Sequence, residues 1–311
     1  MLRPPPVLVT GFGQAFLHEP DLFPARRSGE PWDQEELAFE LADDRYVFSG
    51  LAASDVHALR ARYGPVLLAG GGPGIETLVF RADPRDFLDR DPRSPVRFDL
   101  DYSEDCVRLA GHGIVARLDW RPSLRGALWT SARGRSFVGV FENYFRVLLA
   151  HRLLEAGGAL VHSAGVRDET GAYLLFGPSG AGKSTLCGQV RAAGGGLVSD
   201  DLNAVCLREG RPFLAPVPFF GDHEPDASPQ PLPLRAIGRL SKSPDASLVP
   251  IEPAECLASL VACSPFVSLD PYRVDLLLSN LGSVLERVPA FELRFSRAGS
   301  CWDLLRSAGG S

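Results

Sequence analysis

The chain has 311 residues, 45% of them hydrophobic, and a formal net charge of −6 at pH 7. A chain of this length buries about three quarters of its surface, which is enough for one large or two ordinary domains. The negative charge disfavours nucleic acid and anionic membrane surfaces as partners, because both attract a basic face. Residues Met1 to Val7 lack the apolar core of a signal peptide, so we expect a cytoplasmic protein with no membrane span.

The first part of the chain contains short strand-like runs separated by turn residues, with few helical patterns. We therefore predict a β-rich N-terminal domain over residues 1–135. The strand candidates are Pro6–Thr10, Arg45–Phe48, Val66–Ala69, Thr77–Phe80, Val96–Leu100 and Gly113–Asp119. The glycine-rich stretch Gly70 to Gly74 has no lysine and no helical pattern after it, so we interpret it as a flexible turn.

A helical pattern separates this region from the rest of the chain. Residues 137–154 carry apolar side chains at helical spacing and are followed by Gly157-Gly158. The pattern predicts a buried helix that opens a second domain over residues 136–311.

Two hairpins are predicted in the second domain. Apolar runs at 159–166 and 172–176 are separated by only five polar turn residues, 167–171. Such a turn cannot hold a crossover helix, so the two runs should pair antiparallel. A second hairpin is expected from residues 203–207 and 212–217.

Residues 177–184 read GPSGAGKS and match the phosphate-loop (P-loop) pattern G-x-x-x-x-G-K-S/T. An apolar run precedes the motif and a helical pattern follows it, which is the strand, loop and helix that the motif needs. Its lysine, Lys183, is one of only two lysines among 32 basic residues. Glycines let consecutive N–H groups approach phosphate oxygens at a helix N-terminus, so we expect a nucleoside triphosphate as the ligand.

The motif predicts a role for each of its polar residues. Lys183 is expected to be an exposed loop cation that neutralises the outer phosphates, and the Ser184 hydroxyl to bind Mg²⁺. The residues expected to bind the nucleotide are Gly177, Pro178, Ser179, Gly180, Ala181, Gly182, Lys183, Ser184 and Thr185.

Two adjacent carboxylates, Asp200 and Asp201, follow the short apolar run Gly196 to Ser199. An apolar strand that ends in acid beyond a phosphate loop is the usual form of a Mg²⁺-holding element. One carboxylate can hold the metal while its neighbour accepts a proton from a substrate hydroxyl. The alternative is that the pair caps the following turn.

Three segments together resemble the C-terminal kinase domain of HPr kinase/phosphorylase, which is related in architecture to phosphoenolpyruvate carboxykinase. They read VHSAGV from Val161, YLLFGPSGAGKS from Tyr173 and GLVSDD from Gly196. The resemblance extends over residues 137–300, with the specific matches confined to 161–201. It implies an α/β fold in which a mixed-sheet P-loop kinase domain follows the β-rich N-terminal domain.

The resemblance also implies ATP-dependent transfer of a phosphate to a serine hydroxyl of a protein or peptide. By position, Asp200 is similar to the catalytic base, Asp201 to its acidic partner and His162 to the histidine beside the pair. The implied catalytic residues are Asp200, Asp201, His162 and Lys183, and the implied Mg²⁺ ligands are Ser184 and Asp201. From the residues alone, His162 is equally well explained as a core histidine.

The chain departs from that family where the HPr protein docks. The family's glycine-rich docking segment has no counterpart, and Ala215 to Glu224 follows the acidic strand instead. HPr is therefore not the expected acceptor. A biosynthetic precursor peptide is one alternative, with the N-terminal domain contributing to substrate recognition.

Several alternatives stay open at this stage. Asp222 and Glu224 fit either a further metal ligand or a solvated turn, and Arg235 and Arg239 either stabilise the transferring phosphoryl group or lie on the surface. The same site would also serve a small-molecule kinase or a nucleotide-binding regulatory module without catalysis. Homo-oligomers are compatible with every alternative.

The six cysteines include no C-x-x-C pair. We expect Cys187, Cys206, Cys256 and Cys263 to be small core residues in a reducing compartment rather than metal ligands.

Overall fold

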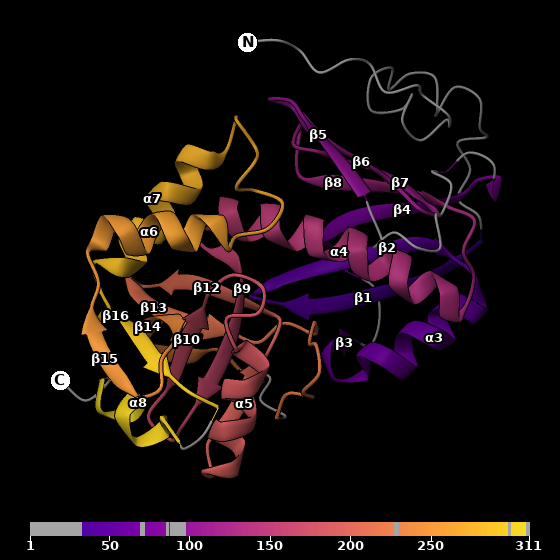
Figure 1. Ribbon diagram of the computed structural model, residues 1–311. Coiled ribbons are helices and arrows are strands. Elements are labelled where there is room, and N and C mark those ends of the chain that lie inside the picture. Colours follow the sequence, from indigo (N-terminus) through magenta and orange to yellow (C-terminus); the bar gives the residue numbers. More distant parts are fainter. Residues whose placement is uncertain are drawn as a thin grey trace. The chain divides into compact units, whose positions relative to one another are not determined.

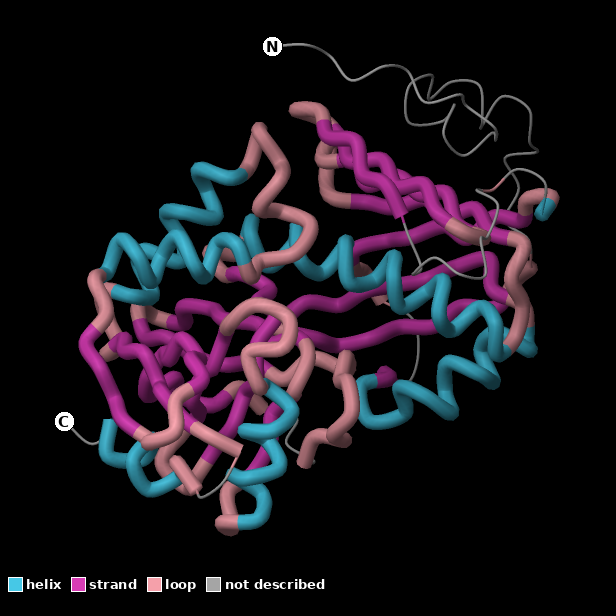
Figure 2. Tube along the Cα trace, in the orientation of Figure 1, coloured by secondary structure: helices cyan, strands magenta, loops and turns pink. Residues whose placement is uncertain are grey.

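The computed structural model describes residues 33–68, 72–84, 87, 98–226, 230–297 and 300–308. The chain divides into two compact units, Met1–Leu148 and Leu149–Ser311. The described residues form two mixed eight-stranded sheets and six α-helices, so the α/β class is confirmed (Figures 1 and 2). Among the same residues, no helix is long and apolar enough to cross a bilayer.

The first unit contains the sheet with strand order β3-β1-β2-β4-β8-β7-β6-β5. Its strands are β1 (Glu35–Leu41), β2 (Asp44–Leu51), β3 (Leu67–Leu68), β4 (Ile75–Arg81), β5 (Phe98–Tyr102), β6 (Cys106–Gly111), β7 (Ile114–Asp119) and β8 (Arg125–Thr130). Strand β4 pairs parallel with both β2 and β8. Helix α3 (Ala53–Tyr63) lies in the connection from β2 to β4, as a parallel pair requires.

The prediction of a β-rich region is confirmed for the described part of this unit. The runs predicted within residues 45–48, 77–80 and 113–119 coincide with β2, β4 and β7, and those at 66–69 and 96–100 overlap β3 and β5. The candidate Pro6–Thr10 lies outside the described residues. Strands β1, β6 and β8 have no counterpart among the predictions.

Helix α4 (Arg135–Glu155) is the long helix that the sequence predicts. Its first half belongs to the core of the first unit, where Phe141 lies 5.3 Å from Phe39 and 4.7 Å from Phe48 between ring centroids. The division between the units falls after Leu148, inside α4. The boundary expected between residues 135 and 136 lies at the start of the helix instead.

The second unit contains the other eight-stranded sheet. Its strands are β9 (Ala159–Arg167), β10 (Ala172–Phe176), β11 (Gly196–Ser199), β12 (Leu202–Arg208), β13 (Arg211–Ala215), β14 (Leu232–Lys242), β15 (Ser247–Pro250) and β16 (Ala290–Phe295). The helices are α5 (Lys183–Ala192), α6 (Pro253–Ala262), α7 (Val274–Leu285) and α8 (Trp302–Ala308). Both predicted hairpins are confirmed, because β9 pairs antiparallel with β10 and β12 pairs antiparallel with β13.

Strand β9 pairs with neighbours along both of its edges. The half that begins at Ser163 pairs with β10 on one edge. On the other edge β11 and then β12 follow one another, with Leu202 opposite His162. The residues between β11 and β12 are Asp200 and Asp201, and the Ser163 N–H donates to the Asp201 carbonyl at 3.0 Å. The phosphate loop after β10 and the acidic pair therefore flank one strand.

Strands β10, β14 and β16 are parallel neighbours. They end at Phe176, Lys242 and Phe295, respectively, so the phosphate loop shares one sheet edge with the ends of two other strands. The edge at the carboxyl ends of parallel strands is where ligands bind in open α/β sheets.

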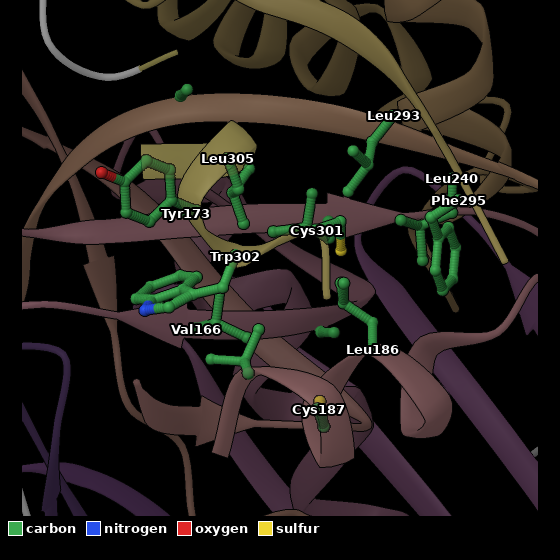
Figure 3. Packing of buried hydrophobic residues seen from close by; sticks show 14 of the residues in the cluster. Val166, Tyr173, Leu186, Cys187, Leu240, Leu293, Phe295, Cys301, Trp302 and Leu305 are labelled. Carbon is green, nitrogen blue, oxygen red and sulfur yellow. The ribbon is translucent and has the colours of Figure 1, made fainter. Parts of the chain in front are cut away.

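A hydrophobic cluster fixes α5 and α8 on this sheet (Figure 3). Leu186 and Cys187 of α5 and Leu305 of α8 are fully buried in it. The rings of Trp302 and Tyr173 meet edge to face at 5.9 Å. Each fully buried leucine contributes about 1.5 to 3 kcal/mol, so the helix that follows the phosphate loop is held from its buried face.

The cysteines are all free thiols. Burial raises the pKa of Cys187 to about 12 and that of Cys256 to about 11, as expected for core residues. Cys206 and Cys263 are only partly buried, so the prediction of a core position is wrong for these two. Cys206 lies near the end of β12, and Cys263 follows the last turn of α6, where its carbonyl accepts a hydrogen bond from the His162 N–H.

Buried polar groups fasten the end of α4 to α7. The Asp270 carboxylate accepts a hydrogen bond from the Arg273 guanidinium at 2.9 Å and lies 3.6 Å from Nε2 of the buried His151. Asn280 donates to the carbonyl of Leu154 at 2.8 Å. Burial by itself raises the pKa of Asp270, but the interactions with His151 and Arg273 outweigh it and hold that pKa below its ordinary value.

We predict that Asp270→Asn lowers the free energy of unfolding by about 3 kcal/mol at neutral pH, because the buried Arg273 loses its counter-charge. The folded pKa lies below the unfolded value of about 3.9, so this stabilisation is present above that pH and is lost as the pH falls through the folded pKa. Denaturant titrations of both proteins should converge toward acid pH. Asp275→Asn, an exposed change on α7, is the control, and a pH-independent difference for Asp270→Asn would contradict the assignment.

Candidate functional site

A cavity of about 790 Å³ lies at the edge of the second unit's sheet where β10, β14 and β16 end. It collects residues that are far apart in the sequence. The predicted site residues that line it are His162, Ser179, Gly180, Ala181, Gly182, Lys183, Ser184, Thr185, Asp200 and Asp201. Gly177 and Pro178 are not among the lining residues. The cavity volume lies within the range of small-molecule sites, about 300 to 1,000 Å³.

The phosphate loop has a backbone that depends on glycine at two positions. Gly180 and Gly182 have φ values of +78° and +107°, which only glycine adopts at low cost. A Cβ on Gly182 would also lie 2.8 Å from the Phe295 ring. Gly182 is the N-cap of α5, and no side chain caps that end. The positive end of the helix dipole therefore faces the cavity and favours an anion there.

Lys183 is not the exposed cation that its loop position predicts. The residue is only 8% exposed, and its Nζ donates to the carbonyl of Gly177 at 3.0 Å and to that of Pro178 at 3.4 Å. Burial lowers the pKa of Lys183. Two neutral carbonyls are weaker partners for an ammonium than phosphate oxygens, so an anion in the loop would compete for this side chain.

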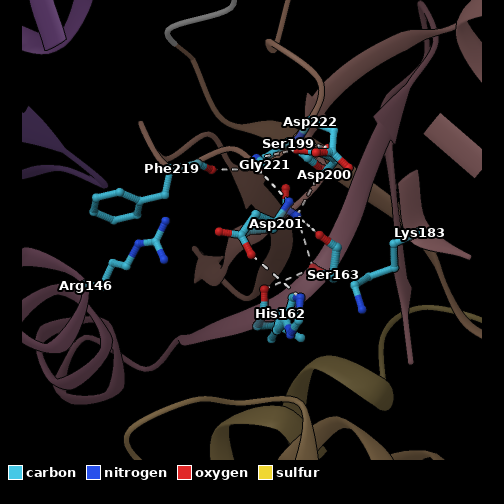
Figure 4. Close-up of polar contacts among 12 residues, drawn as sticks. Arg146, His162, Ser163, Lys183, Ser199, Asp200, Asp201, Phe219, Gly221 and Asp222 are labelled. Atoms are coloured by element: carbon cyan, nitrogen blue, oxygen red, sulfur yellow. Dashed lines mark hydrogen bonds and ion pairs between the residues drawn. The ribbon is translucent and has the colours of Figure 1, made fainter. Parts of the chain in front are cut away.

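Asp200 holds a neighbouring loop in place. Its carboxylate accepts three backbone hydrogen bonds, from Gly221 at 2.7 Å, Asp222 at 2.9 Å and His223 at 3.0 Å (Figure 4). The residue is 5% exposed. Both carboxylate oxygens are thus already engaged, which is a structural task that the expected role of catalytic base does not include.

Asp201 and His162 form the more accessible pair. Oδ1 of Asp201 lies 3.6 Å from Nε2 of His162, and their side chains are 26% and 43% exposed, respectively. Figure 4 shows the Asp201 carboxylate turned toward the His162 ring. His162 is therefore not a core histidine, and the expectation that it neighbours the acidic pair is confirmed for Asp201.

A buried amide fixes the backbone on which this pair stands. Asn203 of β12 donates through Nδ2 to the carbonyl of Ser163 at 2.8 Å and to its hydroxyl at 3.1 Å. Asn203 and Ser163 are both fully buried. On the other side, the His162 N–H donates to the carbonyl of Cys263 at 2.7 Å. His162 is therefore held through its backbone from both edges of β9.

The loop after β13 closes over the start of α5. Nε2 of His223 lies 3.1 Å from the carbonyl of Ser184. This contact, with the bonds to Asp200, places the exposed Asp222 on the cavity wall, whereas Glu224 is not among the lining residues. Of the two carboxylates that the sequence left open, Asp222 is the one that reaches the site.

The two arginines that the sequence left open lie elsewhere. Neither Arg235 nor Arg239 lines the cavity. Arg239 forms ion pairs of 2.6 Å with Glu255 and with Glu292, and these hydrogen bonds raise its pKa. The structure thus explains Arg239 by its partners on the sheet surface and α6.

Several lining residues are missing from the sequence predictions: Gly221, Lys242, Ser243, Pro244, Phe295, Ser296 and Arg297. Gly221 lies on the loop after β13, and the others end or follow strands β14 and β16. No short motif reveals that β14 pairs parallel with β10 and β16 with β14. The composition of the chain held one signal that could have identified Lys242. Both lysines of the chain, Lys183 and Lys242, line this cavity.

A scan against models of known protein families finds no match for this chain, and a search of curated proteins finds no relative. What this site does has to be inferred from its own residues.

We predict that Asp200→Asn releases the backbone of residues 221–223, because hydrogen bonds to a charged acceptor contribute about 1.5 kcal/mol or more each. Amide hydrogen exchange at these residues should become at least about tenfold faster. Asp201→Asn is the matched control and should leave these amides protected. Unchanged exchange in Asp200→Asn would show that the loop is held by other contacts.

Proposed function

We propose that the second unit is an ATP-dependent P-loop kinase, similar to HPr kinase/phosphorylase, that phosphorylates a serine hydroxyl of a protein or peptide. One observation carries the proposal: a single cavity is lined by the phosphate loop, by Asp201 and by His162. A phosphate-binding loop alone would suit any nucleotide-binding module. A carboxylate and a histidine beside it supply what transfer to a hydroxyl needs in addition.

The loop fits the triphosphate of ATP. Its positive-φ glycines open the N-terminus of α5 to an anion, and Lys183 is close enough to exchange its carbonyl partners for phosphate oxygens. The cavity also provides oxygen donors of the kind that Mg²⁺ prefers, the Ser184 hydroxyl and the Asp222 carboxylate. Mg²⁺ would neutralise phosphate charge, and it needs only one or two protein ligands because it keeps waters and phosphate oxygens.

In this proposal Asp201 rather than Asp200 is the base, and Asp222 replaces Asp201 as a metal ligand. The reason is geometric, since Asp200 already accepts three backbone N–H groups whereas Asp201 faces His162. His162 orients the Asp201 carboxylate from the adjacent position on β9.

These residues can carry out the transfer of the γ-phosphate from ATP to the serine hydroxyl. The serine oxygen attacks the γ-phosphorus while its proton passes to Asp201. The bond between the γ-phosphorus and the bridging oxygen breaks, and ADP leaves with the electron pair. Lys183 and the N-terminus of α5 stabilise the negative charge that develops on the phosphates. Substrate recognition by the β-rich N-terminal unit remains a prediction.

We expect Asp201→Asn to slow phosphoryl transfer by about 100-fold or more while changing the Kd for ATP by less than about threefold, because a positioned base acts on the acceptor. Transfer from radiolabelled ATP should be measured with serine peptides, the matching alanine peptides and small polyols. Labelling of polyols alone would favour the small-molecule kinase.

Lys183→Met should lose transfer together with tight ATP binding, because it removes the loop cation.

The control for the Asp201 and Lys183 variants is Glu224→Gln. It changes an exposed carboxylate that lies on the loop after β13, outside the cavity, and it should behave like wild type. Binding of ATP by wild type without transfer to any acceptor would favour the regulatory module. An Asp201→Asn protein that keeps more than a tenth of the wild-type rate would remove Asp201 from the role of base.

The assignment of the metal ligand gives a separate prediction. Asp222→Asn should raise the Mg²⁺ concentration needed for half-maximal ATP binding several-fold. It removes the carboxylate and leaves Ser184 as the remaining proposed protein ligand. Titration of Mg²⁺ at fixed ATP measures this, with Glu224→Gln as the control. A stronger Mg²⁺ dependence in Asp201→Asn than in Asp222→Asn would restore the assignment of Asp201 as the ligand.

A further inference from the structure

Two cations outside the phosphate loop line the same cavity. Lys242 is the last residue of β14, and Arg297 follows the end of β16. Both are exposed, and neither side chain has a hydrogen-bond or ion-pair partner within the described ranges. Other arginines of this sheet are paired, as Arg239 and Arg294 are with Glu292. Unpaired cations in a concave site raise the local concentration of anions.

The strand register places these cations opposite the acidic pair. Phe176, the last residue of β10, lies opposite Ser163 of β9 on one edge and opposite Arg239 of β14 on the other. His162 and Asp201 therefore flank the phosphate loop from the β9 side. Lys242 and Arg297 flank it from the side of β14 and β16.

Local contacts hold the ends of β14 and β16 against the loop. The Ser243 N–H donates to the Phe295 carbonyl at 2.9 Å. The Phe295 ring lies so close to Gly182 that any side chain there would collide with it. The backbone positions of Lys242 and Arg297 are thus fixed relative to the start of α5.

We propose that Lys242 and Arg297 form the subsite for the nucleoside monophosphate part of the nucleotide. The inference rests on the proposed function. If the γ-phosphate faces Asp201, the α-phosphate and the nucleoside extend from the opposite side of the loop, because the three phosphates form a short chain. Lys242 supplies the point charge for the α-phosphate. The planar guanidinium of Arg297 stacks on the base.

An anionic group of the acceptor is the competing occupant of these cations. An acceptor anchored there would have to extend past the phosphate loop to bring its hydroxyl to Asp201, whereas the nucleotide already occupies that loop. The geometry therefore favours the nucleotide, and the acceptor becomes an outcome of the test.

The test measures the binding of ATP and of inorganic tripolyphosphate in the presence of Mg²⁺ by calorimetry. Arg297→Ala should weaken ATP binding about fivefold to tenfold and tripolyphosphate binding less than twofold, because only ATP has a base to stack. Lys242→Met should weaken both ligands by about the same factor, roughly tenfold, because both carry the third phosphate. Arg294→Ala, an exposed arginine of β16 outside the cavity, is the matched control.

The outcomes separate the subsite from the proposed function. Wild type and Arg294→Ala should bind ATP alike, and Lys183→Met should lose binding. If both subsite variants bind ATP within twofold of wild type, the subsite is overturned while the kinase proposal stands. If they instead raise only the KM of the acceptor, the cations belong to the acceptor site. Absence of ATP binding to wild type would overturn both proposals.

Discussion

The candidate site depends on the pairing of strand β9 along both of its edges. One edge holds β10 and, with it, the start of the phosphate loop, and the other holds β11 and β12. Every backbone N–H and C=O in such a buried strand needs a partner, so the neighbours cannot shift without losing several hydrogen bonds at once. Because Asp201 and the phosphate loop are each fixed to β9, the distance between them is set by backbone pairing rather than by flexible side chains. In the proposed kinase this rigidity would keep the base in position, where small displacements are costly.

The acidic pair shows how adjacent identical residues acquire different tasks. The two residues lie in the bend between β11 and β12, and their carboxylates face different neighbours. Asp200 is buried and gathers three N–H groups, which offsets the cost of burying its charge. Asp201 remains accessible beside His162. The loop that Asp200 holds brings Asp222 to the cavity, so the buried aspartate contributes to the site through the residue it positions.

The sequence predicted those parts of the molecule that depend on neighbours in the chain. The strand, loop and helix around residues 177–184, the β9–β10 hairpin and the β12–β13 hairpin are each specified by a few consecutive residues, and the structure contains all of them. The buried state of Lys183 could not be predicted, because it depends on how the loop carbonyls fold back on their own lysine. Lys242 and Arg297 were missed for a different reason. They reach the site because β14 pairs parallel with β10 and β16 pairs parallel with β14, and parallel strands pair over long sequence separations without a local signal.

The mixture of parallel and antiparallel strand pairs places carboxylates on one side of the site and cations on the other. Strand β9 is antiparallel to β10, so its first half lies at the sheet edge where the phosphate loop begins. Asp200 and Asp201, between β11 and β12, lie beside that part of β9. On the parallel side, β14 and β16 leave at the same edge and carry their following residues, Lys242 and Arg297, to it. In a wholly parallel sheet, only the C-terminal ends of strands would lie at this edge. One sheet thus presents carboxylates on one side of residues 177–184 and cations on the other, and in the proposed kinase this arrangement would orient a linear, unevenly charged nucleotide.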